Sequence, residues 1–213
     1  RQMCIRDRGT VVPVEVVWSP SVNSLPGEYR LGYYVSNPSA NDLYENENGQ
    51  PQATAGGDFK SHKDKHGWWV VAQQQLTAHN GDASRGLSIF ANATVHDKAT
   101  NFVDNYQQVG FVYKGPFDAR PKDDIGIGVA RIHVNDDAQD NRRLVNAVNG
   151  IEDYDNPGYL PIQKTEYNSE IYYGVHVTDW LTVRPNLQYV KSPGGVDDVQ
   201  NALVAGIKIQ SKF

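Results

Sequence analysis

The side chains in this sequence that are best suited to chemistry are charged, amide and phenol groups that alternate with apolar residues. Guanidinium, ammonium, carboxylate and amide groups donate or accept hydrogen bonds, and a tyrosine ring adds a flat apolar surface. Such groups on one face of a strand could hold a polar solute without breaking a bond in it. The candidates near the middle of their segments are Arg30, Arg131, Glu170, Tyr172, Arg184, Asn186 and Lys208.

Other sets of reactive side chains are weaker. His62 and His66 are four residues apart and could bind a metal if their polar loop formed a helical turn, but a solvated loop is expected. The Gly-Ile-Gly at 126–128 lacks the third glycine and the following helix of a nucleotide-binding loop. His133 and Glu170 with a serine could be imagined as a hydrolase set, yet no serine lies in a recognisable nucleophile elbow. We therefore expect no enzyme activity, no metal and no cofactor.

Strict alternation predicts the elements that carry the candidates. Between residues 166 and 213 it indicates three strands, in which apolar residues such as Ile171, Val183 and Ile207 alternate with polar ones. Strands of a soluble sandwich are usually shorter, about five or six residues. Repeated segments of about ten residues, with one apolar and one polar face and an aromatic carboxy terminus at Phe213, are typical of a transmembrane β-barrel.

Six further strands are predicted upstream, so that the chain is all-β, with about nine strands of an antiparallel up-and-down barrel. In the last of the six, Arg131 and His133 share the parity of Ile127. This predicts either that a bulge interrupts the strand or that the lower half of the strand turns apolar residues inward. Two long polar stretches, 37–66 and 136–161, have no strong period and are predicted to be surface loops. The six strands are expected at 11–18, 28–36, 67–78, 86–96, 106–115 and 124–135.

The lengths of the connections predict an orientation and a register. If residue 213 lies on the periplasmic side, every periplasmic connection is short and both long polar stretches lie outside the cell, as in outer-membrane barrels. A three-residue turn at 178–180 then sets Glu170 opposite Gln188, Tyr172 opposite Asn186 and Gly174 opposite Arg184. The glycine would leave the Arg184 guanidinium room to swing, either towards a solute or towards Glu170.

Composition excludes some classes of protein. The net charge is -5 and no basic stripe stands out, which argues against nucleic-acid binding. The mean hydropathy is -0.58 and no run of eighteen apolar residues exists, so no transmembrane helix is expected. Residues 1–8 show no alternation and are interpreted as a non-native, adapter-derived tail. Because single-chain bacterial barrels have an even number of strands, residues 9–213 are interpreted as the carboxy-terminal part of a larger barrel.

Several segments resemble the carbohydrate-selective porins (OprB-like), over about residues 11–213. The resemblance implies a sixteen-stranded channel in the outer membrane of a Gram-negative bacterium, through which glucose and related monosaccharides diffuse passively. The seven candidates would then face the lumen, with outer-membrane lipid, lipopolysaccharide and the barrel assembly machinery as partners and Phe213 as the assembly signal. The matching segments are YKGPF at 113–117, GIGVARIHVN at 126–135, TDWLTVRPNLQYV at 178–190, PGG at 193–195 and NALVAG at 201–206.

Two alternatives stay open at this level. A soluble all-β carbohydrate-binding domain would use the same tyrosines and tryptophans on an exposed face, and a general or anion-preferring porin would share the barrel. A soluble sandwich needs two apolar faces that meet in a core, whereas a barrel needs one continuous apolar band. The seven candidates are either sugar contacts or ordinary wall charges that pair across strands.

Overall fold

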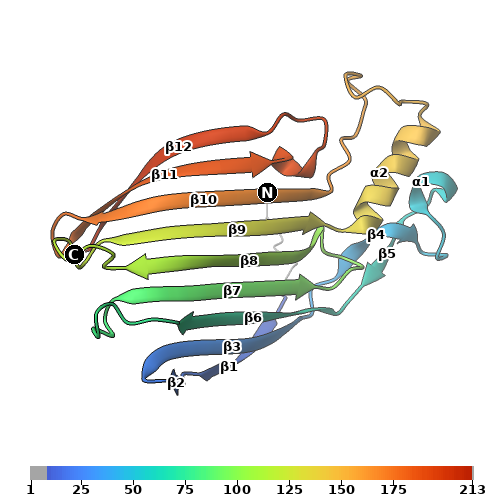
Figure 1. Ribbon diagram of the computed structural model, residues 1–213. Coiled ribbons are helices and arrows are strands. Elements are labelled where there is room, and N and C mark those ends of the chain that lie inside the picture. The colour runs from blue at the N-terminus through green and yellow to red at the C-terminus, as the bar shows by residue number, and fades with distance from the viewer. Residues whose placement is uncertain (1–8, 213) are drawn as a thin grey trace, which may run out of the picture.

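One curved antiparallel sheet dominates the computed structural model, which describes residues 9–212. Its strands follow the order β1-β3-β6-β7-β8-β9-β10-β11-β12, with a short β2 beside β3 (Figure 1). Each long strand therefore pairs with the next long strand along the chain, which is the up-and-down arrangement. The predicted all-β antiparallel fold is confirmed, and within the described residues β1 and β12 are the edges of an open sheet.

The long strands fall where alternation predicts them. The second, third and fifth begin two or three residues earlier than expected, because residues before the alternating segments still pair with a neighbouring strand. Their bounds are β1 Val11–Trp18, β3 Leu25–Ser36, β6 Lys65–Gln75, β7 Gly86–His96, β8 Val103–Lys114, β9 Asp124–Val134, β10 Thr165–His176, β11 Leu181–Lys191 and β12 Ala202–Ser211, and β2 is Ser21–Val22.

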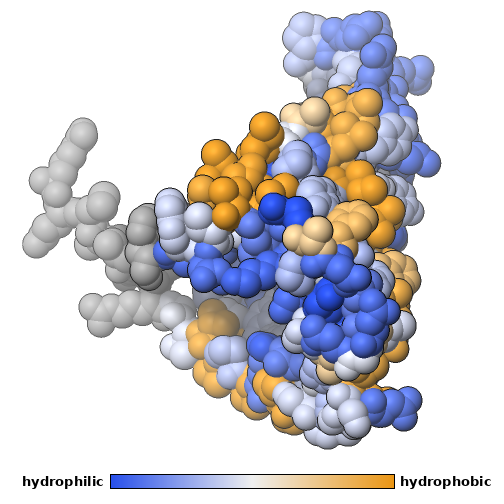
Figure 2. All heavy atoms as spheres, turned by 60° about the vertical axis from the view of Figure 1, so that its left-hand side comes forward, coloured by the Kyte–Doolittle hydropathy of each residue, from blue (hydrophilic) through white to orange (hydrophobic). Residues whose placement is uncertain are grey.

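The two faces of the sheet differ in character. We call the face that carries Leu31, Ile127 and Ile207 the apolar face, and the opposite one, which carries Glu170 and Arg184, the polar face. On the apolar face Ile127 is 53% exposed and Ile207 is 71% exposed. Figure 2 shows hydrophobic patches along the outer margin of the curved wall. A broad exposed apolar surface of this kind is unfavourable in water and is suited to lipid.

The described residues hold no sandwich core. The buried hydrophobic side chains among them are Val134, Ala138 and Val196, all near one end of the sheet and none between two sheets. The soluble sandwich considered above needs a second apolar face to cover the first, and the described residues provide none. No helix in the described part of the chain is long and apolar enough to cross a membrane.

The two long polar stretches contain regular secondary structure, which the prediction of surface loops did not include. The first contains β4 Ala40–Asn46, α1 Gln52–Ala55 and β5 Phe59–His62, and the second contains α2 Asp136–Val148. Local polar contacts replace hydrophobic periodicity here. The Asn46 side chain is 3% exposed and bonds the backbone of Asn48, Gln50 and Gly56. Asn135 caps α2 by accepting a hydrogen bond from the Asp137 N–H at 2.9 Å.

The two insertions lie at the same end of the sheet (Figure 1). We call this the insertion end, and the opposite one, with short connections such as those at 115–123 and 177–180, the turn end. A 3-10 turn, η1 Pro193–Gly195, also lies at the insertion end, where it contacts β10. His62 bonds Asp42 across the β4–β5 hairpin at 2.7 Å instead of meeting His66 at a metal site. The described residues contain no group of three potential metal ligands.

The register of β9 decides the face on which Arg131 lies. β9 pairs with β10 without interruption from His133 opposite Thr165 to Asp124 opposite Gly174. The one irregularity nearby lies in β8, between Val103 and Asn105, and not in β9. Arg131 therefore keeps the parity of Ile127, and β9 contains no bulge. The other expected arrangement is the one found, because the later half of β9 turns the apolar residues Ala130 and Ile132 to the polar face.

Candidate functional site

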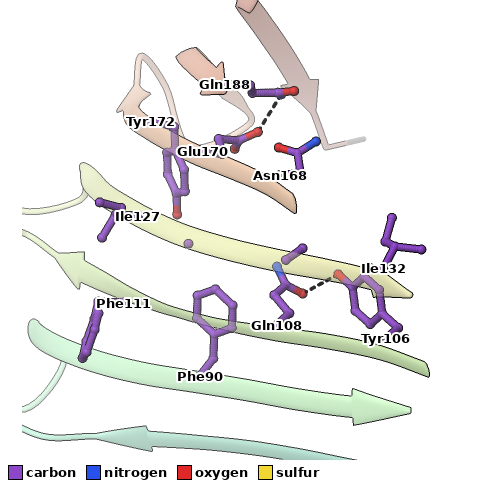
Figure 3. A pocket seen from close by; sticks show the side chains of 12 residues that line it. Phe90, Tyr106, Gln108, Phe111, Ile127, Ile132, Asn168, Glu170, Tyr172 and Gln188 are labelled. Carbon is purple, nitrogen blue, oxygen red and sulfur yellow. Dashed lines mark hydrogen bonds between the residues drawn. The ribbon is translucent and has the colours of Figure 1, made fainter. Parts of the chain in front are cut away.

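A hollow of about 370 Å³ lies on the polar face, across β7 to β11. Three aromatic rings and several uncharged polar groups surround it, together with one carboxylate. Figure 3 shows that these side chains come from neighbouring strands and point into a shared space. The side chains on the polar face that line it are Phe90, Tyr106, Gln108, Ala130, Ile132, Asn168, Glu170, Tyr172 and Gln188.

Glycines hold two of the rings against the wall. A Cβ atom at Gly110 would lie 2.5 Å from the Phe90 ring, and one at Gly126 would lie 2.2 Å from the Tyr172 ring. Each ring thus covers the space that a side chain on the opposite strand would fill. The two aromatic surfaces are therefore held in place by the backbone beneath them, which reduces the side-chain freedom lost when a solute packs on them.

The polar groups of the hollow are oriented by each other. Gln188 Nε2 donates to Glu170 Oε2 at 2.7 Å, and Tyr106 Oη donates to Gln108 Oε1 at 3.1 Å (Figure 3). Glu170 forms no ion pair with any described residue, so its carboxylate keeps acceptor capacity for a solute. Aromatic surfaces beside fixed amide, phenol and carboxylate groups are the chemistry that a neutral, hydroxyl-rich ring needs.

The turn at 178–180 sets the register that its length predicts. Glu170 lies opposite Gln188 and Tyr172 lies opposite Asn186. Asn186 Oδ1 accepts a hydrogen bond from Gln188 Nε2 at 3.3 Å. Lys208 of β12 lies opposite Arg184, so the polar faces of β10, β11 and β12 bring five of the seven candidates together.

Arg184 is paired, and the expectation of a freely moving guanidinium is wrong. Its Nη2 lies 3.3 Å from Asp124 Oδ2, and the guanidinium carbon lies 4.8 Å from the centre of the Tyr172 ring. Gly174 does leave space, since a Cβ there would lie 3.1 Å from Arg184 Nε, but Asp124 fills the role expected of Glu170. Arg184 therefore supports the back of a ring that lines the hollow.

Arg30 belongs to a different part of the polar face. Its Nε donates to Glu28 Oε1 at 2.8 Å, and its Nη1 lies 3.4 Å from Glu15 Oε1. Glu15 also accepts a hydrogen bond from Trp69 Nε1 at 2.6 Å, and the Trp69 ring lies against Gly32. Arg30 is a wall charge in this network and does not line the hollow.

Arg131 does not face the polar side, which corrects its assignment as a lumen-facing candidate. It lies on the apolar face between Gln107 and Tyr167, its partners on β8 and β10, and its Nη1 donates to Asn105 Oδ1 at 2.5 Å. The assignment was wrong because it took the charge of Arg131 as evidence that its side chain faces inward. Near the end of a strand a charged side chain can also lie on the outer face. Phe213, the predicted assembly signal, lies outside the described residues, as do residues 1–8.

Sequence reasoning missed much of the lining. Phe90 lies between Ser88 and Asn92 on the polar parity of its strand, and this aromatic residue at a polar position was the available signal. Asp124, the partner of Arg184, gave no signal, because the two residues meet only through the pairing of β9, β10 and β11. The other lining residues that were missed are Tyr106, Gln108, Ala130, Ile132, Asn168 and Gln188.

The fold and the polar face together define a section of the wall of a porin, the class of outer-membrane β-barrels that enclose an aqueous passage. Residues 4–213 match the family of carbohydrate-selective porins, OprB family, and the chain belongs to that family. The resemblance seen in the sequence is thereby confirmed. Membership indicates a channel rather than an enzyme and places the chain in the outer membrane of a Gram-negative bacterium.

Known relatives cover the chain almost completely. Porin B of Pseudomonas aeruginosa is 73% identical over 208 residues, which are 97% of this chain and 46% of that protein. The putative porin QuiX of Acinetobacter baylyi is 40% identical over 211 residues, which are 97% of this chain and 45% of that protein. A high-pH structure of Pseudomonas putida OprB matches with a TM-score of 0.94 at 73% identity, over 96% of this chain and 49% of that chain. The chain thus spans about half the length of these relatives.

Proposed function

We propose that residues 9–213 form the carboxy-terminal part of a complete porin barrel that lets glucose and related monosaccharides diffuse across the outer membrane. The described sheet has two edge strands, β1 and β12, and an unpaired edge in lipid leaves backbone groups without partners. Further strands of the same barrel would satisfy both edges. Relatives about twice as long as this chain support a closed barrel of about sixteen strands.

The hollow on the polar face is the single observation that carries the proposed selectivity. A sugar offers hydroxyl groups and a weakly apolar ring face but no charge. Phe90 and Tyr172 supply aromatic surfaces, and Glu170, which is oriented by Gln188, supplies an acceptor for sugar hydroxyl groups. Contacts of this kind are individually weak, which suits a channel because the solute must also leave.

The first prediction tests the aromatic surfaces of the hollow. Replacing both rings, Phe90→Leu with Tyr172→Leu, should lower the rate of glucose entry several-fold relative to that of an uncharged amino acid of similar size, because the stacking surface is lost. Liposome swelling with the complete barrel measures both rates. Tyr34→Leu is the matched control, since its ring lies against Gly67 on the same face but outside the hollow.

The outcomes separate the alternatives. An unchanged ratio of the two rates in a double variant that folds would contradict the proposed role of the hollow. Equal rates for glucose and the amino acid in the unmodified barrel would indicate a general porin, and faster entry of a sugar acid than of glucose would indicate an anion-preferring one. Folding of each variant is checked by the heat-dependent shift of its band in detergent gels.

A further inference from the structure

Two cations flank a tyrosine on the apolar face near the insertion end. Tyr167 of β10 lies opposite Arg131 of β9 and opposite Lys191 of β11, so the three side chains form one row across three strands. The Lys191 ammonium lies 5.9 Å from the centre of the Tyr167 ring, and that ring is 39% exposed. We call this set the cationic row.

The charge of the cationic row is not neutralised by the described residues. Neither Arg131 nor Lys191 forms an ion pair within that part of the chain, whereas Arg30 and Arg184 on the polar face both do. Arg131 donates to the uncharged amide of Asn105, and this amide in turn donates to Asp104 at 2.7 Å. The next pair towards the insertion end is His133 with Thr165, and Asp136 lies 3.4 Å from this histidine.

The row borders the surface that is suited to lipid hydrocarbon. Val129 of β9 and Tyr189 of β11 lie on the same face, each two positions nearer the middle of the sheet than the cation on its strand. Val129 is 42% exposed and Tyr189 is 45% exposed. Ile171, further along β10, is 48% exposed. Cations with aromatic residues at the border of such a band lie where hydrocarbon gives way to lipid head groups.

We propose that the cationic row binds a phosphate group of an outer-leaflet lipid head group. Arginine presents a planar fork of donors that matches a phosphate, lysine adds a compact charge, and tyrosine has an apolar body with a polar tip. The continuous apolar band beside the row would hold the acyl chains of the same molecule. The inference rests on the proposed role of the chain as a barrel wall and not on sugar selectivity.

The second prediction is that removing both cations abolishes this binding. We expect the complete barrel in detergent to bind lipid A that carries both phosphates at least tenfold more tightly than dephosphorylated lipid A, as measured by native mass spectrometry. Arg131→Gln with Lys191→Gln should remove the difference, while Arg131→Lys with Lys191→Arg should keep most of it. The control pair Lys63→Gln with Lys98→Gln removes equal charge from exposed positions at the same end but outside the row.

Three results would overturn the proposal. The neutralised variant could bind phosphorylated lipid A as tightly as the unmodified protein does, or dephosphorylated lipid A could bind equally well. Inorganic phosphate at the same concentration could displace the lipid, which would identify a free anion as the ligand. Liposome swelling with glucose is measured on the same samples, so that a failure of sugar selectivity is seen separately from a failure of lipid binding.

Discussion

At the scale of single residues, a charged pair on the polar face holds an aromatic ring in place. Arg184 is 29% exposed and its partner Asp124 is 8% exposed, so the pair is partly shielded from water. The guanidinium packs on one side of Tyr172, and the ring then lines the hollow. Arg184 is therefore expected to act on a solute through Tyr172 rather than by direct contact.

The third prediction follows from this pairing. Arg184→Ala should lower the glucose selectivity of the barrel. It should also lower the free energy of unfolding by about 1–3 kcal/mol, because charged hydrogen bonds are lost; a fully buried pair would cost more. Arg184→Lys should also lower the selectivity, since an ammonium does not stack on the ring as a guanidinium does. Liposome swelling and thermal unfolding in detergent measure the two effects.

A double-mutant cycle tests whether Arg184 and Asp124 affect the glucose selectivity together or independently. If the pair acts as a unit, adding Arg184→Ala to Asp124→Asn should change the selectivity less than the sum of the two single effects. Additive effects would mean that Arg184 and Asp124 act independently, and an unchanged selectivity in Arg184→Ala would make this residue an ordinary wall charge.

At the scale of elements, a buried carboxylate fastens the turn between β8 and β9 to the end of β10. Asp123 is 1% exposed and accepts hydrogen bonds from Arg120 Nη2 at 3.0 Å, Tyr173 Oη at 2.6 Å and the His176 N–H at 2.9 Å. Burial by itself would raise the pKa of Asp123, but these hydrogen bonds and the Arg120 charge outweigh it and lower the pKa to about 2.

The fourth prediction is a loss of this stabilisation in acid. Because the pKa of Asp123 is lower in the folded state than its ordinary value of 3.8, its contribution is fully present above about pH 4 and is lost as the pH falls towards 2. Asp123→Asn should therefore be less stable than the unmodified barrel at pH 6, and the difference should shrink between pH 4 and pH 2. Thermal unfolding in detergent at several pH values measures it.

The control for this turn is Asp118→Asn. Asp118 also bonds an arginine, Arg85, but its side chain is 73% exposed, so water screens the interaction and the effect on stability should be smaller. A difference between Asp123→Asn and the unmodified barrel that is the same at pH 6 and pH 2 would show that the Asp123 charge does not contribute.

At the scale of the whole molecule, the two ends of the sheet are unequal. The insertion end carries the β4–β5 hairpin, α1 and α2, and the turn end carries only short connections (Figure 1). Outer-membrane barrels have long extracellular and short periplasmic connections. We therefore expect the insertion end to face outside the cell, which is also the orientation that the outer-leaflet lipid site requires.

The fifth prediction tests this orientation. An epitope inserted at Gly49, which has open space around it and a positive φ of 72°, should be labelled by antibody on intact cells. The same epitope at Asp179, whose side chain is 85% exposed in the turn after β10, should be labelled only after the outer membrane is permeabilised. The reverse labelling pattern would show that the turn end faces outside the cell.

The assignment of Phe213 as the assembly signal stays a prediction.

The sequence by itself determined the long strands and one register. Alternation and turn length are local properties, so the nine long strands within residues 9–212 and the pairing of Glu170 with Gln188 follow from neighbouring residues alone. Only the tertiary structure decided the face of Arg131, the pairing of Arg184 with Asp124 and the composition of the hollow. These depend on residues far apart in the chain, which meet through the cumulative register of several strands. The folded insertions were likewise hidden, because side-chain hydrogen bonds such as those of Asn46 stabilise them without any hydrophobic period.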